Sequence, residues 1–358
     1  MNPLLQVSQH GQQIWLDNLS RTLLRDDHLA RFIAEDGIAG VTTNPAIFHK
    51  AIAGGRYYED DLAALNTSSL SAEARYEALV VPDVQQACDL LLPHYRQSKG
   101  RTGYVSLEVS PALAHEPAGT LAAGRRLKAA VDRPNVLIKV PATGAGITAI
   151  EQLIEAGVSV NVTLIFSLAQ VDAVAQAYVR GLERRHAAGG DVTPIMSVAS
   201  LFLSRLDTLI DAQLEQLGGE ALALRGKSAV ATAKLAYQRY CTRFHGEEFA
   251  RLRSLGARPQ FLLWASTGTK NPAYSDLLYV EPLIGAETIN TLPDGTLDAL
   301  RDHGRVEASL ATDVDKATAH YAALQRHGID LERVGERLQH EGLQQFEQAF
   351  AALLQLTA

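Results

Sequence analysis

The chain has 358 residues, of which 47% are hydrophobic and 20% charged, a balance typical of a folded globular protein with a substantial core. Its formal net charge of −7 at pH 7 argues against a general affinity for nucleic acid or for an anionic membrane, and we expect neither as a partner. The two cysteines show no metal-ligand spacing, and the N-terminal segment lacks a secretion-signal pattern, so we expect a cytoplasmic protein without a metal.

Short apolar runs rich in β-branched residues recur along the chain and predict strands. Longer stretches with helical periodicity lie between most of them. Strands that alternate with helices are typical of parallel βαβ units, and about eight such units favour a closed (β/α)8 barrel. The expected strands are residues 13–16, 40–43, 103–109, 136–140, 158–165, 194–198, 260–265 and 278–280. The main expected helices are residues 75–97, 146–155, 168–187, 201–216, 227–244 and a last group at about 310–354.

Two regions carry more helix than a barrel requires. We interpret residues 218–258 and 305–358 as helical additions to a single barrel domain spanning residues 1–358, because no repeat, low-complexity tract or long linker divides the chain. Their amphipathic stripes could cover the barrel or form an interface between copies of the chain, so a homo-oligomer stays open.

Polar residues recur where the expected strands end, which is where (β/α)8 enzymes carry their catalytic groups. The first strand is followed by Asp17, the third carries Glu108 and the fourth carries Lys139. The others are Thr42 and Asn44 after the second strand, Asn161 and Thr163 on the fifth, Ser200 after the sixth and Ser266 after the seventh.

Lys139 is the only charged residue in the apolar stretch 135–142. A buried lysine must find a partner or lose its proton, and a neutral amine attacks carbonyl carbons. The alternative is a lysine that reaches the surface at a strand end or forms a structural ion pair. Glu108 also has apolar neighbours on its strand. Burying a carboxylate there costs free energy unless it is paired or has a catalytic function, and we expect its pKa to be raised.

The remaining strand-end residues also have purely structural interpretations. Asp17 could cap a helix beginning near Ser20, residues 42–45 could form only a turn, and Ser200 could cap the next helix. Asn161 and Thr163 alternate with apolar residues and so share one face of their strand. A hydrogen-bonded core pair is possible, but a site that orients hydroxyl groups accounts for them better.

A phosphate site is expected near the segment that follows the seventh strand. Residues 266–270 offer the Ser266 hydroxyl and the Lys270 cation, and Arg205 at the start of a helix could reach the same place. Surface ion pairing is the alternative for either cation. Residues 143–149 match Gly-x-Gly-x-x-Ala, but the acidic residue expected about twenty positions later is missing, which argues against a dinucleotide site.

Several motifs together resemble those of transaldolases, in the same order and spacing. They are Asp17, the Thr-Thr-Asn-Pro at 42–45, Val-Ser-Leu-Glu-Val at 105–109, the lysine strand at 136–142, Asn-Val-Thr-Leu-Ile-Phe-Ser at 161–167 and Ser-Leu-Phe-Leu-Ser-Arg at 200–205. The resemblance runs from about residue 14 to 293, and the chain length with the segment 264–272 is similar to the longer bacterial branch.

The resemblance implies a class I aldolase of the pentose phosphate pathway that works without metal or cofactor and moves a dihydroxyacetone unit between sugar phosphates. It implies that Lys139 forms the Schiff base and that Asp17 handles the C4 hydroxyl proton. The other implied roles are water management for Glu108 and Thr163, binding of the dihydroxyacetone hydroxyls for Asn44, Asn161 and Thr42, and a pocket wall with phosphate clamp for Ser200, Phe202 and Arg205.

One departure concerns phosphate. Many relatives place Ser-Phe-Arg-Asn after the seventh strand, where this chain has Ser-Thr-Gly-Thr-Lys-Asn at 266–271, so the contact would fall to Lys270 or to Arg205. Two rival functions stay open, an aldolase that releases free dihydroxyacetone and a catalytically silent sugar-phosphate-binding or scaffold protein on the same barrel.

Overall fold

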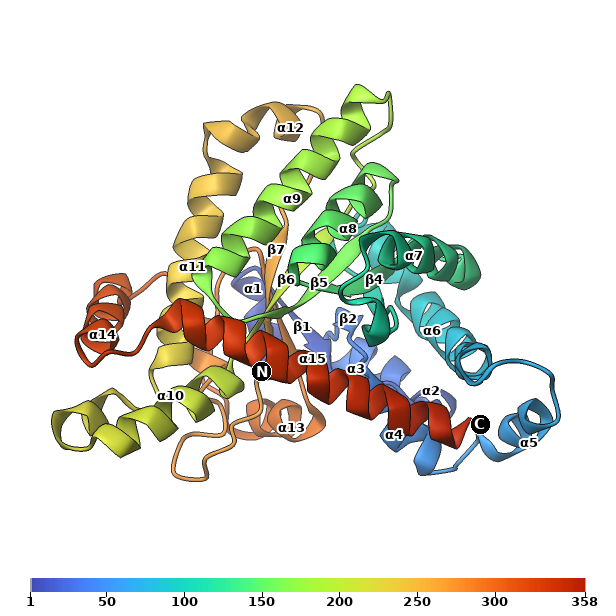
Figure 1. Ribbon diagram of the computed structural model, residues 1–358, viewed down its shortest axis with the longest axis horizontal. Coiled ribbons are helices and arrows are strands. Elements are labelled where there is room, and N and C mark those ends of the chain that lie inside the picture. Colours follow the sequence, from blue (N-terminus) through green and yellow to red (C-terminus); the bar gives the residue numbers. More distant parts are fainter. Residues whose placement is uncertain (1, 358) are drawn as a thin grey trace.

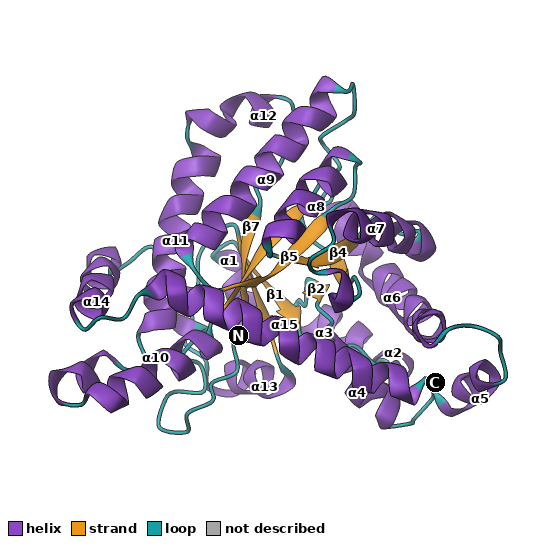
Figure 2. Ribbon diagram, in the orientation of Figure 1, coloured by secondary structure: helices purple, strands orange, loops and turns teal. Residues whose placement is uncertain are grey.

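Eight parallel strands close into a barrel with helices around it (Figure 1; Figure 2). The computed structural model describes residues 2–357. Each strand pairs with the next in the sequence, and β8 pairs back to β1 from Gln12↔Thr288 to Leu16↔Leu292. The predicted (β/α)8 barrel is confirmed. The strands are β1 (Gln12–Leu16), β2 (Gly40–Val41), β3 (Tyr104–Glu108), β4 (Val136–Pro141), β5 (Val160–Ile165), β6 (Ser197–Phe202), β7 (Phe261–Ala265) and β8 (Thr288–Leu292).

The eighth strand was predicted in the wrong place. Residues 278–280 form turns before β8, although Val280 is fully buried. The polar residues of β8 concealed it from an apolar pattern, and their hydrogen bonds inside the protein make this composition tolerable. Thr288 Oγ1 accepts a hydrogen bond from Gln12 Nε2 at 2.9 Å, and Asn290 Nδ2 donates to Tyr279 O at 3.0 Å.

The sixth strand also differs from its expected position. It runs from Ser197 to Phe202 and so contains Ser200, and the next helix begins only at Ser204. The interpretation of Ser200 as a helix cap is therefore wrong, and its side chain is placed by the alternation of a strand.

Helices cover the outside of the barrel, as the alternating pattern predicted (Figure 2). Two of them begin at hydroxyl residues that cap the helix. Thr143 Oγ1 accepts from Gly146 N at 2.9 Å at the start of α8, and Ser167 forms a capping box with Gln170 at the start of α9. The helices are α1 (Pro3–Gln9), α2 (Arg21–Arg25), α3 (His28–Asp36), α4 (Pro45–Ala53), α5 (Glu59–Asn66), α6 (Ala72–Gln97), α7 (Pro117–Val131), α8 (Gly144–Glu155), α9 (Leu168–Ala187), α10 (Ser204–Leu217), α11 (Ser228–His245), α12 (Ala250–Ser254), α13 (Asp294–His303), α14 (Val314–Arg326) and α15 (Leu331–Leu356).

The two expected helical additions are present. The first region contains α11 and α12, and the second contains α14 and α15. Helix α11 packs against α14 at the side, and α15, red in Figure 1, crosses the barrel and reaches α4 and α6. That these parts form one domain stays a prediction. No helix within residues 2–357 is both long enough and apolar enough to span a membrane.

Helix α15 lies over the end of the barrel at which the strands finish. Gln339 Nε2 donates to Ala142 O at 2.9 Å and to Leu164 O at 3.0 Å, so one side chain joins the helix to the ends of β4 and β5. Leu164 has a positive φ of 58° at a β-bulge in β5, which turns its carbonyl out of the regular ladder. The helix therefore closes one side of the barrel mouth.

Candidate active site

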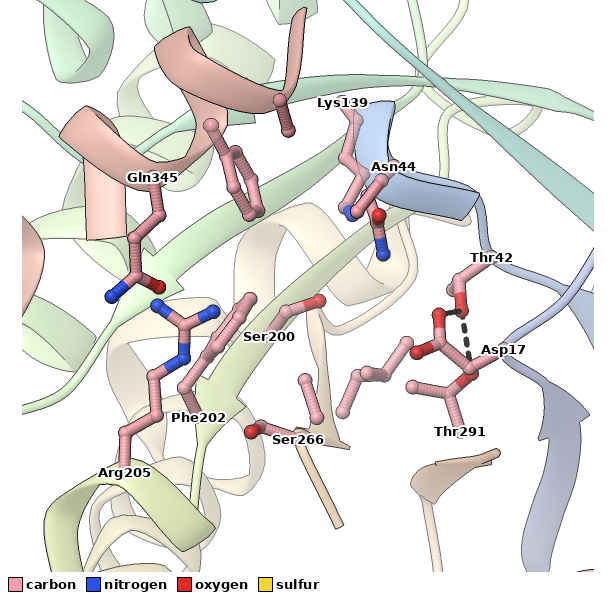
Figure 3. A pocket seen from close by; sticks show the side chains of 15 residues that line it. Asp17, Thr42, Asn44, Lys139, Ser200, Phe202, Arg205, Ser266, Thr291 and Gln345 are labelled. Atoms are coloured by element: carbon pink, nitrogen blue, oxygen red, sulfur yellow. Dashed lines mark hydrogen bonds between the residues drawn. The ribbon is translucent and has the colours of Figure 1, made fainter. Parts of the chain in front are cut away.

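A cavity of about 240 Å³ lies at the barrel mouth beneath α15 (Figure 3). Its wall contains residues from strand ends and from α15, in the position at which (β/α)8 enzymes carry their sites. Eight of the predicted residues line it, namely Asp17, Thr42, Asn44, Lys139, Ser200, Phe202, Arg205 and Ser266. Within residues 2–357, no three His, Cys, Asp or Glu side chains gather as metal ligands.

Lys139 points into the barrel mouth. It is 5% exposed, and its Nζ donates to Thr43 O at 2.9 Å. Phe346 of α15 covers it, with the ring centroid 5.9 Å from Nζ. The interpretation of a lysine that reaches bulk solvent is therefore wrong, and the amine faces a cavity large enough for a small molecule.

Glu108 stands beside Lys139, since the two residues pair in register across β3 and β4. Its Oε2 lies 3.9 Å from Lys139 Nζ and has no hydrogen-bond partner among the described residues. Burial raises the pKa of Glu108 to about 7, against a lowering by Lys139 and with a further rise from Asp17. The expected rise is confirmed, and the carboxyl can gain or lose a proton near neutrality.

Asp17 follows β1 and takes part in a short chain of hydroxyl groups. Thr42 Oγ1 donates to Asp17 Oδ1 at 2.7 Å and lies 2.6 Å from Thr291 Oγ1. Burial raises the pKa of Asp17, against lowering by Lys139 and by the Thr42 hydrogen bond. The helix after it, α2, is capped by Ser20, whose side chain accepts from Leu23 N. Asp17 is thus free of the capping role considered above.

Asn44 has both a structural and a functional position. Its Oδ1 accepts from Ile47 N at 3.0 Å and caps α4, with Pro45 in the first turn. The turn interpretation is correct in that respect. The cap uses only the oxygen, and Figure 3 shows the amide nitrogen pointing into the cavity. The helix cap therefore fixes the orientation of a hydrogen-bond donor in the site.

Asn161 and Thr163 lie behind the cavity wall instead of on it. Asn161 is fully buried, its Nδ2 donates to Ser106 Oγ at 3.0 Å, and its Oδ1 accepts from Ser200 Oγ at 2.7 Å. Asn161 therefore acts on the cavity through Ser200, which lines it. Thr163 is also buried, and its Oγ1 has no partner among the described residues.

Arg205 supplies a positive charge on the side of the cavity away from Asp17 (Figure 3). It belongs to the first turn of α10, its guanidinium lies 5.7 Å from the Phe202 ring centroid, and burial lowers its pKa. Within residues 2–357 no hydrogen bond or ion pair to Arg205 is formed. Nearby, Ser266 Oγ lies 2.8 Å from Ser204 Oγ. An unpaired guanidinium in a cavity is suited to an anionic ligand.

The structure does not bring Lys270 to this cavity. Lys270 is exposed and lines a separate cleft with Asp207 and Asp211. The segment after β7 folds on itself, because Thr269 Oγ1 donates to Ser275 O at 2.9 Å. Lys270, which was predicted from the sequence to contact phosphate, therefore lies outside this cavity.

Seven lining residues were missed from the sequence, of which Thr291, Gln345 and Phe346 are polar or aromatic; the others are Ala46, Leu263, Ala265 and Ala349. Thr291 lies on β8, which was predicted in the wrong place, so its position near a strand end was not seen. Gln345 and Phe346 belong to α15. No local pattern indicates that a helix at the C-terminal end returns to the barrel mouth.

Comparisons with known proteins agree with this geometry. A family model described as Transaldolase/Fructose-6-phosphate aldolase matches residues 14–357. A protein named Transaldolase from Thiobacillus denitrificans is 58% identical over 355 residues, covering 99% of each chain. One of that name from Neisseria gonorrhoeae is 51% identical over 354 residues, again covering 99% of each. Transaldolase 1 of Streptomyces coelicolor is 47% identical over 353 residues, covering 98% of this chain and 93% of its own.

Proposed function

The chain belongs to the transaldolase/fructose-6-phosphate aldolase family, and from that premise we infer that it works as a transaldolase. It transfers a dihydroxyacetone unit from sedoheptulose 7-phosphate or fructose 6-phosphate to an aldose phosphate, glyceraldehyde 3-phosphate or erythrose 4-phosphate, in the pentose phosphate pathway. The observation that carries this proposal is the Lys139 amine, buried at the wall of a cavity that also holds the Asp17 carboxyl and the Arg205 guanidinium.

We propose that Lys139 is the nucleophile. Its Nζ adds to the C2 carbonyl carbon of the ketose, and loss of water gives an iminium that withdraws electrons from the bond between C3 and C4. Asp17 accepts the proton of the C4 hydroxyl, the C3 to C4 electron pair moves into the iminium, and the aldose phosphate leaves. An enamine remains on Lys139 and adds to the second aldehyde in the reverse order of steps. The raised pKa of Asp17 supports this role, because it makes the carboxylate a stronger base.

Glu108 and Thr163 are proposed to handle the water that leaves and returns. Both carry a buried oxygen without a partner among the described residues, and Glu108 Oε2 is 3.9 Å from the amine. Oxygens of this kind bind a water molecule readily. With a pKa of about 7, Glu108 can protonate the leaving hydroxyl and later accept a proton from an incoming water.

The three-carbon unit carries no phosphate, so we propose that hydrogen bonds hold it next to Lys139. Asn44 and Ser200 reach the cavity directly, while Asn161 orients Ser200 and Thr42 orients Asp17. The phosphate of the substrate lies at Arg205 with Ser266 beside it, and Phe202 forms the wall between. The position of Lys270 in a separate cleft supports Arg205 over Lys270 for this contact.

The test is borohydride reduction of the enzyme with fructose 6-phosphate, followed by mass measurement of the intact protein. Reduction of an imine adds a stable mass to the wild type, and Lys139→Ala should add none. The control is Lys270→Ala, which removes an exposed lysine outside the cavity and should trap as the wild type does. Trapping at the wild-type level in Lys139→Ala contradicts the assignment.

The same preparation separates the two rival functions. With donor alone, an aldolase releases dihydroxyacetone steadily. A transaldolase releases one equivalent of aldose phosphate per site, keeps the dihydroxyacetone unit as the enamine on Lys139, and makes no further net product until an acceptor aldose phosphate is added. A silent binding protein forms no imine at all. We propose a cytoplasmic location, which the low cysteine content favours, and a homo-oligomer that would use the exposed helices.

A further inference from the structure

We propose that Gln345 of α15 is a specificity residue that binds the substrate phosphate together with Arg205, so that the C-terminal helix selects phosphorylated sugars. This inference rests on the proposed function. It begins with the cation, since Arg205 lines the cavity and makes no hydrogen bond or ion pair within residues 2–357. A phosphate monoester has three terminal oxygens that accept more hydrogen bonds than one planar guanidinium can donate to them, so further donors are needed.

Gln345 lines the same cavity, and Figure 3 draws its amide toward the guanidinium of Arg205. The backbone of α15 comes close there, because a Cβ built on Gly342, one turn before Gln345, would be 3.4 Å from Arg205 Nη1. The amide of Gln345 forms no hydrogen bond among the described residues. It is therefore available to a ligand that binds at Arg205.

The donors and acceptors of Arg205 and Gln345 determine which atom of the amide can contact a phosphate. Arg205 offers only donors, and Figure 3 draws the amide oxygen of Gln345 on its side. Rotation of the amide about the terminal bond of the side chain turns its nitrogen donor toward a phosphate held by Arg205. A phosphate at Arg205 would accept from the guanidinium and from the Gln345 nitrogen together. No other donor side chain from α15 lines this cavity.

The position of Gln345 is held by the neighbouring turns of the helix. Gln339 Nε2 binds Ala142 O and Leu164 O, and Phe346 packs over Lys139 with 5.9 Å between its ring centroid and Nζ. Phe346 of α15 thus covers the Lys139 amine, and the adjacent Gln345 lies on the side of the cavity that contains Arg205. The backbone that carries Gln345 is therefore already in place when a ligand binds, and only the side chain itself has to be ordered.

The experiment compares Gln345→Ala with Gln344→Ala. Gln344 is the adjacent residue, is also exposed, does not line the cavity, and has its Nε2 3.0 Å from His340 Nε2. With saturating sedoheptulose 7-phosphate as donor, Gln345→Ala should raise KM for glyceraldehyde 3-phosphate about tenfold with kcat little changed. KM for unphosphorylated glyceraldehyde should stay within about twofold, and Gln344→Ala should match the wild type for both acceptors.

A second variant, Gln345→Glu, keeps the size of the side chain and replaces the donor with a negative charge. It should weaken competitive inhibition by inorganic phosphate by more than about tenfold, whereas Gln344→Glu should not. The inference is overturned if Gln345→Ala raises KM equally for glyceraldehyde 3-phosphate and glyceraldehyde. It is also overturned if substitutions at Gln344 and Gln345 change KM and phosphate inhibition equally.

Phosphate binding also separates this inference from the proposed function. Binding of inorganic phosphate to each variant can be followed by calorimetry without any turnover. If the wild type binds phosphate but forms no borohydride-trapped imine, the proposed transaldolase function fails while the phosphate contact is still measured. If the imine forms and Gln345→Ala binds phosphate as the wild type does, the role of Gln345 fails alone.

Discussion

At the scale of single residues, the site depends on carboxyl groups that burial has made basic. Glu108 and Asp17 both have raised pKa values, and both lie close enough to Lys139 for its charge to oppose that rise. Asp17 accepts a hydrogen bond from Thr42, whereas the buried Oε2 of Glu108 has no partner among the described residues. The two acids therefore differ in surroundings, which suits them to different proton transfers.

The pH dependence of imine formation should follow Glu108. Below a pH of about 7 the carboxyl holds the proton that the leaving hydroxyl needs, so the single-turnover rate should fall as pH rises through that value. Glu108→Gln cannot supply this proton, and we expect it to lower the rate by about 10² or more and to remove the inflection.

The measurement is borohydride quenching of single turnovers between about pH 5 and 9, a range that spans the Glu108 transition. Glu116→Gln, an exposed position that does not line the cavity, is the control for loss of a carboxylate. An inflection that persists in Glu108→Gln assigns the titrating group elsewhere.

At the scale of elements, the glycine pattern at the start of α8 has a packing cause. The sequence Gly-x-Gly-x-x-Ala is not part of a dinucleotide fold, since the sheet is a closed barrel. A Cβ at Gly146 would lie 1.9 Å from Pro141 O, whereas a Cβ at Gly144 would meet no atom within 4 Å. Gly146 lets α8 start directly against the end of β4, which carries Lys139.

Gly146→Ala should therefore destabilise the protein by about 2 kcal/mol or more, because the overlap must be relieved by moving the helix or the strand. Gly144→Ala, two residues away, should be neutral or stabilising by up to about 1 kcal/mol, since alanine favours the helix. Urea unfolding of both variants measures the difference. Equal stability of the two would show that the start of α8 is free to move.

At the scale of the whole molecule, α15 joins the last part of the chain to the first. Phe350 packs edge-to-face on Tyr76 of α6 with 5.5 Å between ring centroids, and Tyr76 packs likewise on Phe48 of α4 at 6.0 Å. Arg75 Nη1 donates to Thr357 O at 3.2 Å. The cover of the cavity is therefore held at both ends, by Gln339 on one side and by these aromatic rings on the other.

Loss of the aromatic contact should affect both stability and substrate binding. Phe350→Ala should lower the free energy of unfolding by about 3 kcal/mol or more, the usual range for a buried phenylalanine, and Phe350→Leu should cost clearly less. Because Gln345 and Phe346 lie about one turn earlier on the same helix, we also expect a higher KM for phosphorylated acceptors in Phe350→Ala. Denaturant unfolding and steady-state kinetics on the same samples check this. An unchanged KM in the destabilised variant would show that the packing of Phe350 does not influence substrate binding.

The barrel, six of its strands and the main candidates for chemistry could be predicted from the sequence, whereas the sixth strand was placed too early and the eighth in the wrong segment. Apolar runs of period two and polar residues at strand ends are local features, and parallel strands in a barrel must all finish at the same end. That rule was enough to bring Asp17, Asn44 and Lys139 into one cavity. Glu108 was found by a different argument, because burying an ionisable side chain among apolar neighbours costs free energy unless the group is paired or has a function.

How this cavity is closed and where its charges lie depend on the tertiary structure. Thr291 lies on a strand too polar to be predicted from an apolar pattern, and Lys270 lines a separate cleft. Gln345 lies on a helix whose Gln339 donates to a carbonyl 197 residues earlier in the chain. Such contacts depend on the packing of distant segments, which side-chain periodicity does not encode. The buried amine of Lys139 could thus be found from its own strand, whereas the helix that covers it was seen only in three dimensions.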